Sequence, residues 1–244
     1  MHISCAHCGL QRICFPKSLS SNEIAQLDQI VSSHPAIPRG SQLFSAGDAA
    51  DFLYALKSGV VKLSRFDQAG NEIIHAFYLP GDVLGMEALD SPVYPFDAIT
   101  LDNCTFCRIH RDDLETLAQK IPTLNRQILS MLAQDLRLER EHFDQLLNKT
   151  AEERVAAFVL SIANRFHARG LDSTSFRLPI LHREVATYLG LTPETFSRVL
   201  NRFQNNGWLS WRRKQVDILD AEALQALAEG CAQPECHYRA RKRG

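Results

Sequence analysis

The sequence predicts an α+β fold in three parts: an N-terminal β-roll, a long helix that pairs two copies, and a C-terminal winged helix-turn-helix. Between Gly40 and Gly85, glycines interrupt short apolar runs about every ten residues, which is typical of strands joined by tight turns. Farther along, the stretch from Leu124 to Leu147 carries an apolar stripe at steps of three and four residues, as in a coiled coil. A third stretch has the pattern of a helix, a glycine turn and a capped helix, followed by a basic hairpin.

This chain of 244 residues is 45% hydrophobic and 23% charged, which is typical of a soluble protein with two domains. No stretch is long and apolar enough for a membrane span, and the N-terminus lacks the apolar core of an export signal, so we expect a cytoplasmic protein. The net charge of -1 hides a local excess, because the segment from His182 to Lys214 carries six Lys or Arg against two Asp or Glu. That excess predicts one basic face, as in nucleic-acid-binding proteins.

Residues 1–19 form a short segment in which Cys5, Cys8 and Cys14 are spaced C-x2-C-x5-C. The chain has seven cysteines, an odd number, and no export signal, so a disulfide framework is not expected. Three thiols this close cannot all be buried by so few neighbours, whereas a soft metal would satisfy them. Zinc and an iron-sulfur cluster both fit, and either needs a fourth ligand from elsewhere in the chain. The alternative is a set of reactive or incidental thiols.

Residues 20–121 are predicted to form the β-roll. Ser20, with Glu23 three residues later, caps an amphipathic helix that extends to Ser33. Strands are expected at residues 52–56 and 73–77, between the glycine turns. Because such a roll commonly encloses a small molecule, sensing is the attractive interpretation for this part.

The last strand of the roll contains both Cys104 and Cys107. Side chains three apart on a strand point to opposite faces, so only one of these thiols is expected to meet the N-terminal cysteines. For Cys104 we favour a buried small side chain. A helix over residues 110–121 follows, with Leu114 and Leu117 facing inward.

Residues 122–148 are predicted to form the dimerisation helix, which Pro122 can open because the first-turn amides need no partner within the helix. The stripe on this helix is Leu129, Leu132, Leu136, Glu139, Phe143 and Leu146. In a parallel pair the two Glu139 carboxylates would meet, at a cost of roughly 1 to 4 kcal/mol at about 4 Å, so the dimer could come apart. The alternative is a helix that packs only on its own domain, with Glu139 at the edge of the stripe.

Residues 149–230 are predicted to form a winged helix-turn-helix that binds DNA. A helix over residues 152–169 comes first, and a shorter helix then ends at Gly190. After a tight turn, Thr192 caps the next helix, with Pro193 at its first position. In a helix-turn-helix, the N-terminal end of this second helix reaches base edges in the major groove.

Three side chains near the start of this helix are candidates for base reading. Arg198 fits bidentate contact with guanine, Glu194 can accept from cytosine N4, and Ser197 can contact thymine. The following hairpin is predicted to be a two-stranded wing, and its tip offers three cations to the DNA phosphates: Arg212, Arg213 and Lys214. The alternative is an ordinary helical hairpin in which Arg198 is a solvated charge.

Residues 231–244 are expected to form a disordered basic tail. Cys231 and Cys236, together with His237, would be the candidates for a second metal site. We favour the simple tail, because a frayed terminus provides no framework for ligands.

Cysteines, β-roll, long helix and helix-turn-helix follow one another as in the FNR-type oxygen-sensing transcription regulators of the CRP/FNR superfamily, which the chain resembles from about Cys5 to Leu227. The motifs that carry the resemblance are the cysteine run, the stretch NKTAEERVAAF at 148–158 and the stretch ETFSR at 194–198. The resemblance implies a cyclic-nucleotide-binding-like roll that acts as the sensor domain. It also implies a homodimer that binds double-stranded DNA and contacts RNA polymerase, without enzymatic activity.

The resemblance further implies an oxygen-labile 4Fe-4S cluster. Its ligands would be Cys5, Cys8, Cys14 and Cys107, because Cys107 occupies the family's position in the last strand and Cys104 matches no family ligand. In the family, the intact cluster promotes dimerisation and binding to a palindromic TTGAT-like site under anaerobic conditions, which controls genes of anaerobic metabolism.

Cyclic-nucleotide binding is not expected. Nucleotide-binding relatives hold the phosphate with an arginine, whereas the corresponding stretch from Ser91 to Ala98 has no arginine and offers Asp97 instead. Two alternatives remain open: a zinc-stabilised regulator that senses another signal, and, in a different class, an iron-sulfur redox protein. The sequence has no G-x-G-x-x-G after a strand, no P-loop and no H-E-x-x-H helix, which argues against an enzyme.

Overall fold

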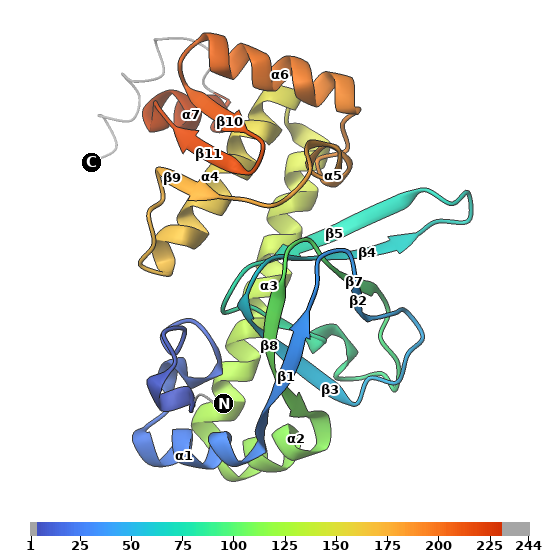
Figure 1. Ribbon diagram of the computed structural model, residues 1–244, viewed down its shortest axis with the longest axis vertical. Coiled ribbons are helices and arrows are strands. Elements are labelled where there is room, and N and C mark those ends of the chain that lie inside the picture. Colours follow the sequence, from blue (N-terminus) through green and yellow to red (C-terminus); the bar gives the residue numbers. More distant parts are fainter. Residues whose placement is uncertain (1–3, 231–244) are drawn as a thin grey trace. The chain divides into compact units, whose positions relative to one another are not determined.

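The computed structural model describes residues 4–230, and its contacts divide the chain into two compact units, Met1–Leu138 and Glu139–Gly244. Figure 1 labels the elements of both units. The boundary between the units falls inside the long helix. The predicted basic tail, with Cys231 and Cys236, lies outside the described residues. No helix within residues 4–230 is long and apolar enough to cross a membrane.

The first unit begins with two short 3-10 turns, η1 (Cys5–His7) and η2 (Phe15–Ser18), and continues with helix α1 (Ser21–Ile30). The predicted cap of α1 is confirmed. Ser20 Oγ accepts from the Glu23 amide, while Glu23 Oε2 accepts from the Ser20 amide at 2.7 Å. These bonds satisfy two amides that the first turn of a helix leaves without partners.

The β-roll consists of two four-stranded antiparallel sheets, with strand orders β1-β8-β3-β6 and β2-β7-β4-β5. The strands are β1 (Val31–Ile37), β2 (Gln42–Phe44), β3 (Phe52–Ser58), β4 (Val61–Phe66), β5 (Glu72–Tyr78), β6 (Val83–Leu84), β7 (Asp97–Thr100) and β8 (Cys104–His110). The expected strands at 52–56 and 73–77 are confirmed. The expectation that the first helix reaches Ser33 is wrong, because Val31 begins β1 and pairs with Ile109 of β8.

Glycine at the turn between β3 and β4 is required by both space and backbone. Gly59 has a φ of +92°, and a Cβ on it would lie only 2.4 Å from Cys104 Sγ. A larger residue would strain the turn and strike the neighbouring strand. The glycine spacing seen in the sequence therefore has a local physical cause here.

Two hydrophobic cores lie on opposite faces of the sheet that contains β3 and β8. Alternation along β3 sends Leu53 to one core and Tyr54 to the other. The helix-side core joins this sheet to α1, to α2 (Arg111–Lys120) and to the start of α3 (Pro122–Asn148). The roll core fills the space between the two sheets, where Tyr94 stacks on Phe44 with ring centroids 3.8 Å apart.

The second unit combines the end of α3 with four more helices and a three-stranded antiparallel sheet of order β10-β11-β9. The elements are α4 (Ala151–Ala168), β9 (Ser175–Arg177), α5 (His182–Tyr188), α6 (Pro193–Asn205), β10 (Leu209–Arg212), β11 (Gln215–Ile218) and α7 (Ala221–Ala228). The predicted wing corresponds to β10 and β11. The structure adds β9 and α7, which the sequence analysis did not anticipate.

Candidate metal centre and nucleic-acid interface

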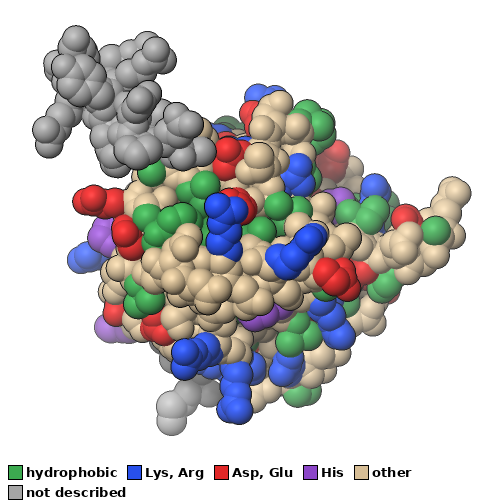
Figure 2. All heavy atoms as spheres, turned by 90° about the horizontal axis from the view of Figure 1, so that it is seen from above, with side chains coloured by type: hydrophobic (Ala, Val, Ile, Leu, Met, Phe, Trp, Pro, Cys, Tyr) green, Lys and Arg blue, Asp and Glu red, His purple; other side chains and the backbone are tan. Residues whose placement is uncertain are grey.

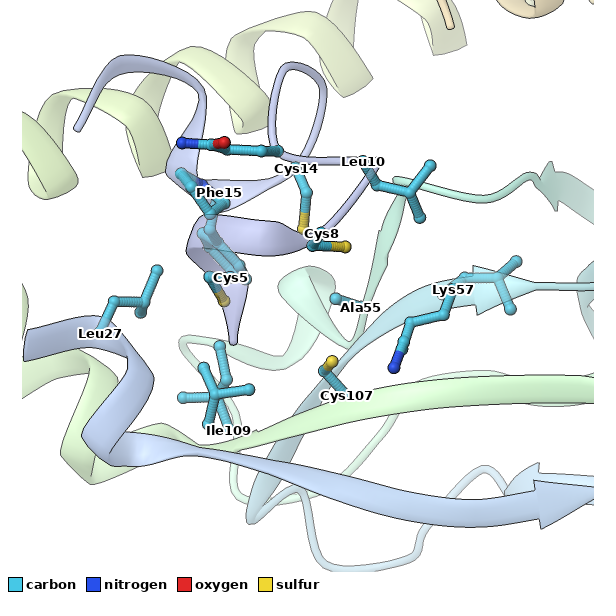
Figure 3. Close-up of a pocket in the computed structure, with 14 residues that line it drawn as sticks. Cys5, Cys8, Leu10, Cys14, Phe15, Leu27, Ala55, Lys57, Cys107 and Ile109 are labelled. Atoms are coloured by element: carbon cyan, nitrogen blue, oxygen red, sulfur yellow. The ribbon is translucent and has the colours of Figure 1, made fainter. Parts of the chain in front are cut away.

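Four thiols line one pocket of the first unit (Figure 3). Cys5, Cys8 and Cys14 come from the N-terminal segment, and Cys107 comes from β8. The other lining side chains are mainly apolar, with Lys57 of β3 also at the pocket. The structure thus brings together the four residues that the family resemblance implies as ligands.

The N-terminal segment is fastened to α1 by one carboxylate. Asp28 Oδ1 accepts from the Cys5 amide at 2.7 Å, and Asp28 Oδ2 accepts from the Ser4 hydroxyl. Ser4 Oγ in turn caps η1 by accepting from the Ala6 amide. Sequence analysis missed Asp28, although a signal was available, because the residue follows Ile24 by four positions on the buried face of α1.

Apolar contacts hold the other end of the segment. Phe15, directly after Cys14, is only 1% exposed and belongs to the helix-side core. Ile13 lies against the turn at Gly81, where a Cβ would be 2.4 Å from Ile13 Cδ1. Because Gly81 has no side chain, the segment can lie directly on this turn, which places Cys14 at the pocket.

The two cysteines of β8 have different surroundings, as their spacing predicts. Cys107 pairs in register with Ala55 of β3 and lies at the pocket. Cys104 is fully buried in the roll core, where its thiol donates to the carbonyls of Val60 and Asp102 at 3.4 and 3.3 Å. Cys104 is therefore a buried small side chain.

Burial raises the pKa of three pocket thiols, those of Cys5, Cys14 and Cys107. It raises the pKa of Cys14 to about 12. It also raises the pKa of Cys5, and the hydrogen bond and negative charge of Asp28 raise it further. The pKa of Cys107 is raised by burial, an effect that the Lys57 ammonium opposes. Without a metal these three thiols stay protonated at neutral pH, so metal binding must displace their protons.

The donor set of four thiols suits a soft metal centre, either zinc or an iron-sulfur cluster. Zinc needs four donors at about 2.3 Å from one centre, which brings its sulfurs to within about 4 Å of one another. In the part of the chain that the structure describes, no three His, Cys, Asp or Glu side chains are grouped closely enough to hold one metal ion. An iron-sulfur cluster is likewise held by four thiolates, so the four thiols at this mainly apolar pocket are the candidate donors for either group.

The second unit contains the expected helix-turn-helix. Helix α5 ends at Tyr188, and Gly190 then turns the chain with a φ of +63°. Thr192 Oγ1 caps α6 by accepting from the Thr195 amide at 3.2 Å. The buried face of α6 is Phe196, Val199, Leu200 and Phe203.

The candidate base-reading residues lie on the exposed side of α6. Glu194, Ser197 and Arg198 are all exposed, and Arg198 Nη2 donates to Thr195 Oγ1 at 3.2 Å. Figure 2 shows Lys and Arg side chains interspersed with Asp and Glu on the face seen from above. Glu194, Ser197 and Arg198 are therefore accessible to an external ligand.

The wing turn carries the three predicted phosphate-binding cations. Arg212 and Arg213 are exposed and Lys214 is partly buried. Arg213 has a φ of +56°. Within residues 4–230 it is the only residue other than glycine with a positive φ. A left-handed backbone conformation costs free energy for a residue with a side chain. Glycine would adopt this conformation at lower cost, but the turn has an arginine there.

The predicted seam of α3 is partly exposed. Leu129, Leu136 and Phe143, spaced by seven residues, are 58%, 49% and 60% exposed. Leu132 and Leu146 are partly buried, and Glu139 is exposed. A row of exposed apolar side chains at heptad spacing is available for a partner helix.

Each of the two units matches a known protein family model. The family model described as "Crp-like helix-turn-helix domain" matches residues 153–227, and the model described as "Cyclic nucleotide-binding domain" matches residues 36–121. The transcriptional activator protein anr of Pseudomonas aeruginosa is 37% identical over 226 residues, which are 93% of each chain. The fumarate and nitrate reduction regulatory protein of Vibrio cholerae is 38% identical over 93% of this chain and 90% of its own length.

Solved structures have the same fold. FixK2 from Bradyrhizobium japonicum matches with a TM-score of 0.74 and 28% identity, over 81% of this chain and 97% of that one. A transcriptional regulator of the CRP family from Thermus thermophilus, TTHB099, matches with a TM-score of 0.65 at 22% identity, over 82% and 99%. The second match bears on the fold alone.

The roll, the long helix and the helix-turn-helix define a DNA-binding transcription regulator, which is not an enzyme. The relatives from Pseudomonas aeruginosa and Vibrio cholerae match 93% of this chain. The chain belongs to the CRP/FNR family. The predicted fold class and the suspected family are therefore confirmed.

Proposed function

We propose that this regulator responds to oxygen. With a 4Fe-4S cluster bound it forms a homodimer on a palindromic TTGAT-like operator, and in air it releases the operator, so that genes of anaerobic metabolism are controlled. The observation that carries the proposal is the meeting of Cys5, Cys8, Cys14 and Cys107 in one apolar pocket. Relatives named for fumarate and nitrate reduction support it.

When bound, the cluster supplies iron–thiolate bonds and reactivity towards oxygen. The chain supplies the attachment. Three thiolates of the N-terminal segment and the Cys107 thiolate of β8 would tie that segment to the roll. Metal ligation in small sites is worth about 10 kcal/mol or more, whereas moving an equilibrium from almost all monomer to almost all dimer takes about 5.5 kcal/mol. Ligation is thus strong enough to control pairing.

The helix-side core connects the thiols to the seam. Cys5, Cys14 and Cys107 pack against it, and so do Met131 and Leu132 of α3. Leu132 is also a member of the predicted seam. Release of the N-terminal segment would therefore remove packing from beneath the helix that has to pair.

Pairing through α3 would cover the exposed seam residues, at a cost from the Glu139 carboxylates that meet there. This cost makes the dimer dependent on the added support of the first unit. Two copies of α6 about 34 Å apart would then read two half-sites one turn of DNA apart.

On the operator, Arg198, Glu194 and Ser197 would contact base edges, each good bidentate pair being worth about 1 to 3 kcal/mol of discrimination. The three wing cations would add affinity without sequence preference, and salt would weaken their contribution. The dimer on its operator would also contact RNA polymerase.

A cyclic nucleotide is not part of the proposal. Arg111 of α2 reaches the stretch after η3 (Met86–Ala88), but its Nη1 donates to the Ala88 and Ser91 carbonyls at 3.4 and 2.6 Å. Asp97 accepts from the Ala46 amide in the same region. A phosphate there would meet a carboxylate and an arginine that already has partners.

The replacement Cys14→Ala tests the proposal. It removes one ligand, so we expect anaerobically purified protein to lose most of its iron and sulfide and to bind operator at least about tenfold more weakly, since loss of a ligand lowers metal affinity by this order or more. Iron and sulfide determination and fluorescence anisotropy with operator DNA measure the two effects. Cys104→Ala is the matched control, because Cys104 lies in the roll core, and it should keep its iron.

Normal anaerobic operator binding by Cys14→Ala would contradict the oxygen-sensing proposal. Air-protected protein that is colourless and contains zinc would identify a zinc-stabilised regulator with another signal, because an iron-sulfur cluster absorbs visible light and zinc does not. A coloured protein with reductase activity and no affinity for palindromic DNA would instead identify a redox protein.

A further inference from the structure

One guanidinium in the second unit holds three backbone carbonyls at once. Arg154 Nε donates to Lys149 O at 2.9 Å, Nη2 to Leu146 O at 2.8 Å, and Nη1 to Leu189 O at 3.1 Å. All three of its nitrogens thus have acceptors, and the side chain is partly buried. The base-reading and phosphate-binding roles described above leave Arg154 without a function.

The three carbonyls belong to helix ends that matter for DNA reading. Leu146 lies in the last turn of α3, where carbonyls lack partners within the helix, and Lys149 follows that turn. Leu189 is the C-cap of α5, directly before the turn at Gly190 that leads into α6. A cation is favourable at the negative ends of two helices, and a planar guanidinium can bond in several fixed directions.

Further contacts join the same two places. The ring of His142, on α3, stacks on Tyr188 of α5, with centroids 4.0 Å apart and planes 5° apart. A Cβ on Gly190 would lie 3.4 Å from Leu146 Cδ2 and 3.6 Å from Arg154 Nη1, so the turn passes close to both side chains. The last turns of α3 and the helix-turn-helix therefore form one packed body.

We propose that Arg154 is a positioning residue that fixes the angle between the end of α3 and the helix-turn-helix, and thereby sets the separation of the two recognition helices in a dimer. The inference rests on the proposed function in one respect, which is that two copies pair through α3. Since α3 would be the shared axis of the pair, any change of angle at Leu146 moves both copies of α6 relative to the half-sites. DNA requires this separation to match one helical turn.

Arg154→Lys tests the inference, because lysine keeps the charge but cannot supply three donors in a rigid plane. The measurement is anaerobic fluorescence anisotropy of the full chain with three palindromic operators, whose half-sites have the natural spacing or one base pair more or less. We expect the parent to prefer the natural spacing by about tenfold, as for a comparable defect in a site, and the variant by less than about threefold.

A second readout separates positioning from damage. Binding to a duplex with one half-site depends on α6 itself, so we expect Arg154→Lys to stay within about twofold of the parent there. Arg169→Lys is the matched control. Arg169 lies just beyond the other end of α4, where its Nη1 donates to Arg165 O at 2.6 Å, and its replacement should leave the spacing preference unchanged.

His142→Ala provides a second variant, because it removes the aromatic contact between the same two segments. We expect it to weaken the spacing preference as well. The inference is overturned if both variants keep the preference of the parent, or if Arg154→Lys loses half-site binding in parallel. A parent that pairs on no operator of any spacing would overturn the proposed dimer and the inference with it, whereas a parent with a clear preference leaves only the inference at stake.

Discussion

Asp28 has a position that gives one side chain control over the N-terminal segment. It comes from α1 and accepts hydrogen bonds from both Ser4 and Cys5, so it holds the first cysteine where the chain enters the pocket. Each such bond contributes about 1 kcal/mol net, and more where a charged acceptor is involved. Its loss should free the segment locally without disturbing the roll, whose cores do not include it.

We expect Asp28→Ala to make Cys5 react about three- to tenfold faster with a thiol reagent in metal-free protein, because the lost bonds no longer hold the segment in place. The change in acidity acts in the same direction, since Asp28 raises the pKa of Cys5 and its removal increases the thiolate fraction at a given pH. Mass spectrometry of labelled peptides measures the rate. Asp113→Ala, at an exposed position on α2, is the control, and equal rates in both variants would contradict the assigned role.

At the scale of single elements, α3 contains the proposed switch. We expect Glu139→Ala to give a dimer that persists in air, because the carboxylate repulsion at the seam, roughly 1 to 4 kcal/mol, is gone. Sedimentation of anaerobic and aerated samples measures the effect, and the dissociation constant should fall at least about fivefold. Glu141→Ala is the matched control, since Glu141 lies off the stripe. A Glu139→Ala protein that dissociates in air like the parent would show that this acid does not release the pair.

Elements with local signals could be predicted from the sequence, and those that depend on distant partners could not. Ser20 and Thr192 mark the starts of α1 and α6 by their caps, which involve only neighbouring residues. Strand β9 has three residues and exists because Phe176 pairs with Val216 of β11. Helix α7 did carry a signal, the cap by Asp220, which accepts from the Ala223 amide.

The same distinction holds for the candidate site. Alternation along β8 is local, so it correctly separated Cys104 from Cys107. The family resemblance, rather than spacing, selected Cys107 as a ligand, and the structure brings it to the pocket with the N-terminal cysteines. Asp28 escaped notice because its donors, Ser4 and Cys5, lie 24 and 23 positions away. The Leu189 acceptor of Arg154 is 35 positions away, and no periodic pattern operates over such separations.

At the scale of the whole molecule, the two units can be followed separately. Both tryptophans of the chain, Trp208 and Trp211, belong to the second unit. Tryptophan fluorescence therefore reports the unfolding of the DNA-binding unit. This selectivity makes an ionisable group in that unit accessible to measurement in the intact protein.

We expect the second unit to lose stability in alkali through Tyr188. Burial raises the pKa of Tyr188 to about 12, with the Glu139 charge also raising it and Arg165 opposing. Between about pH 10 and pH 12 the unfolded chain loses this phenolic proton while the folded chain keeps it, so the contribution is fully present below about pH 10 and is lost as the pH rises, by about 2 to 3 kcal/mol. Urea unfolding followed by fluorescence measures this loss. Tyr188→Phe should show a shallower decline, and an identical decline in both proteins would contradict the assignment.

The position of the unit boundary inside α3 has a practical result for modular exchange. A gene fusion that joins a foreign input domain at Ala151, where α4 begins, would discard His142 and Leu146 and leave Tyr188 and Arg154 without their contacts on α3. A crossover just upstream of Glu139 keeps the second unit, with its contacts to the end of α3, intact. Recombination that shuffles such input domains, in nature or in the laboratory, should therefore tolerate junctions in the middle of this helix better than junctions at its end.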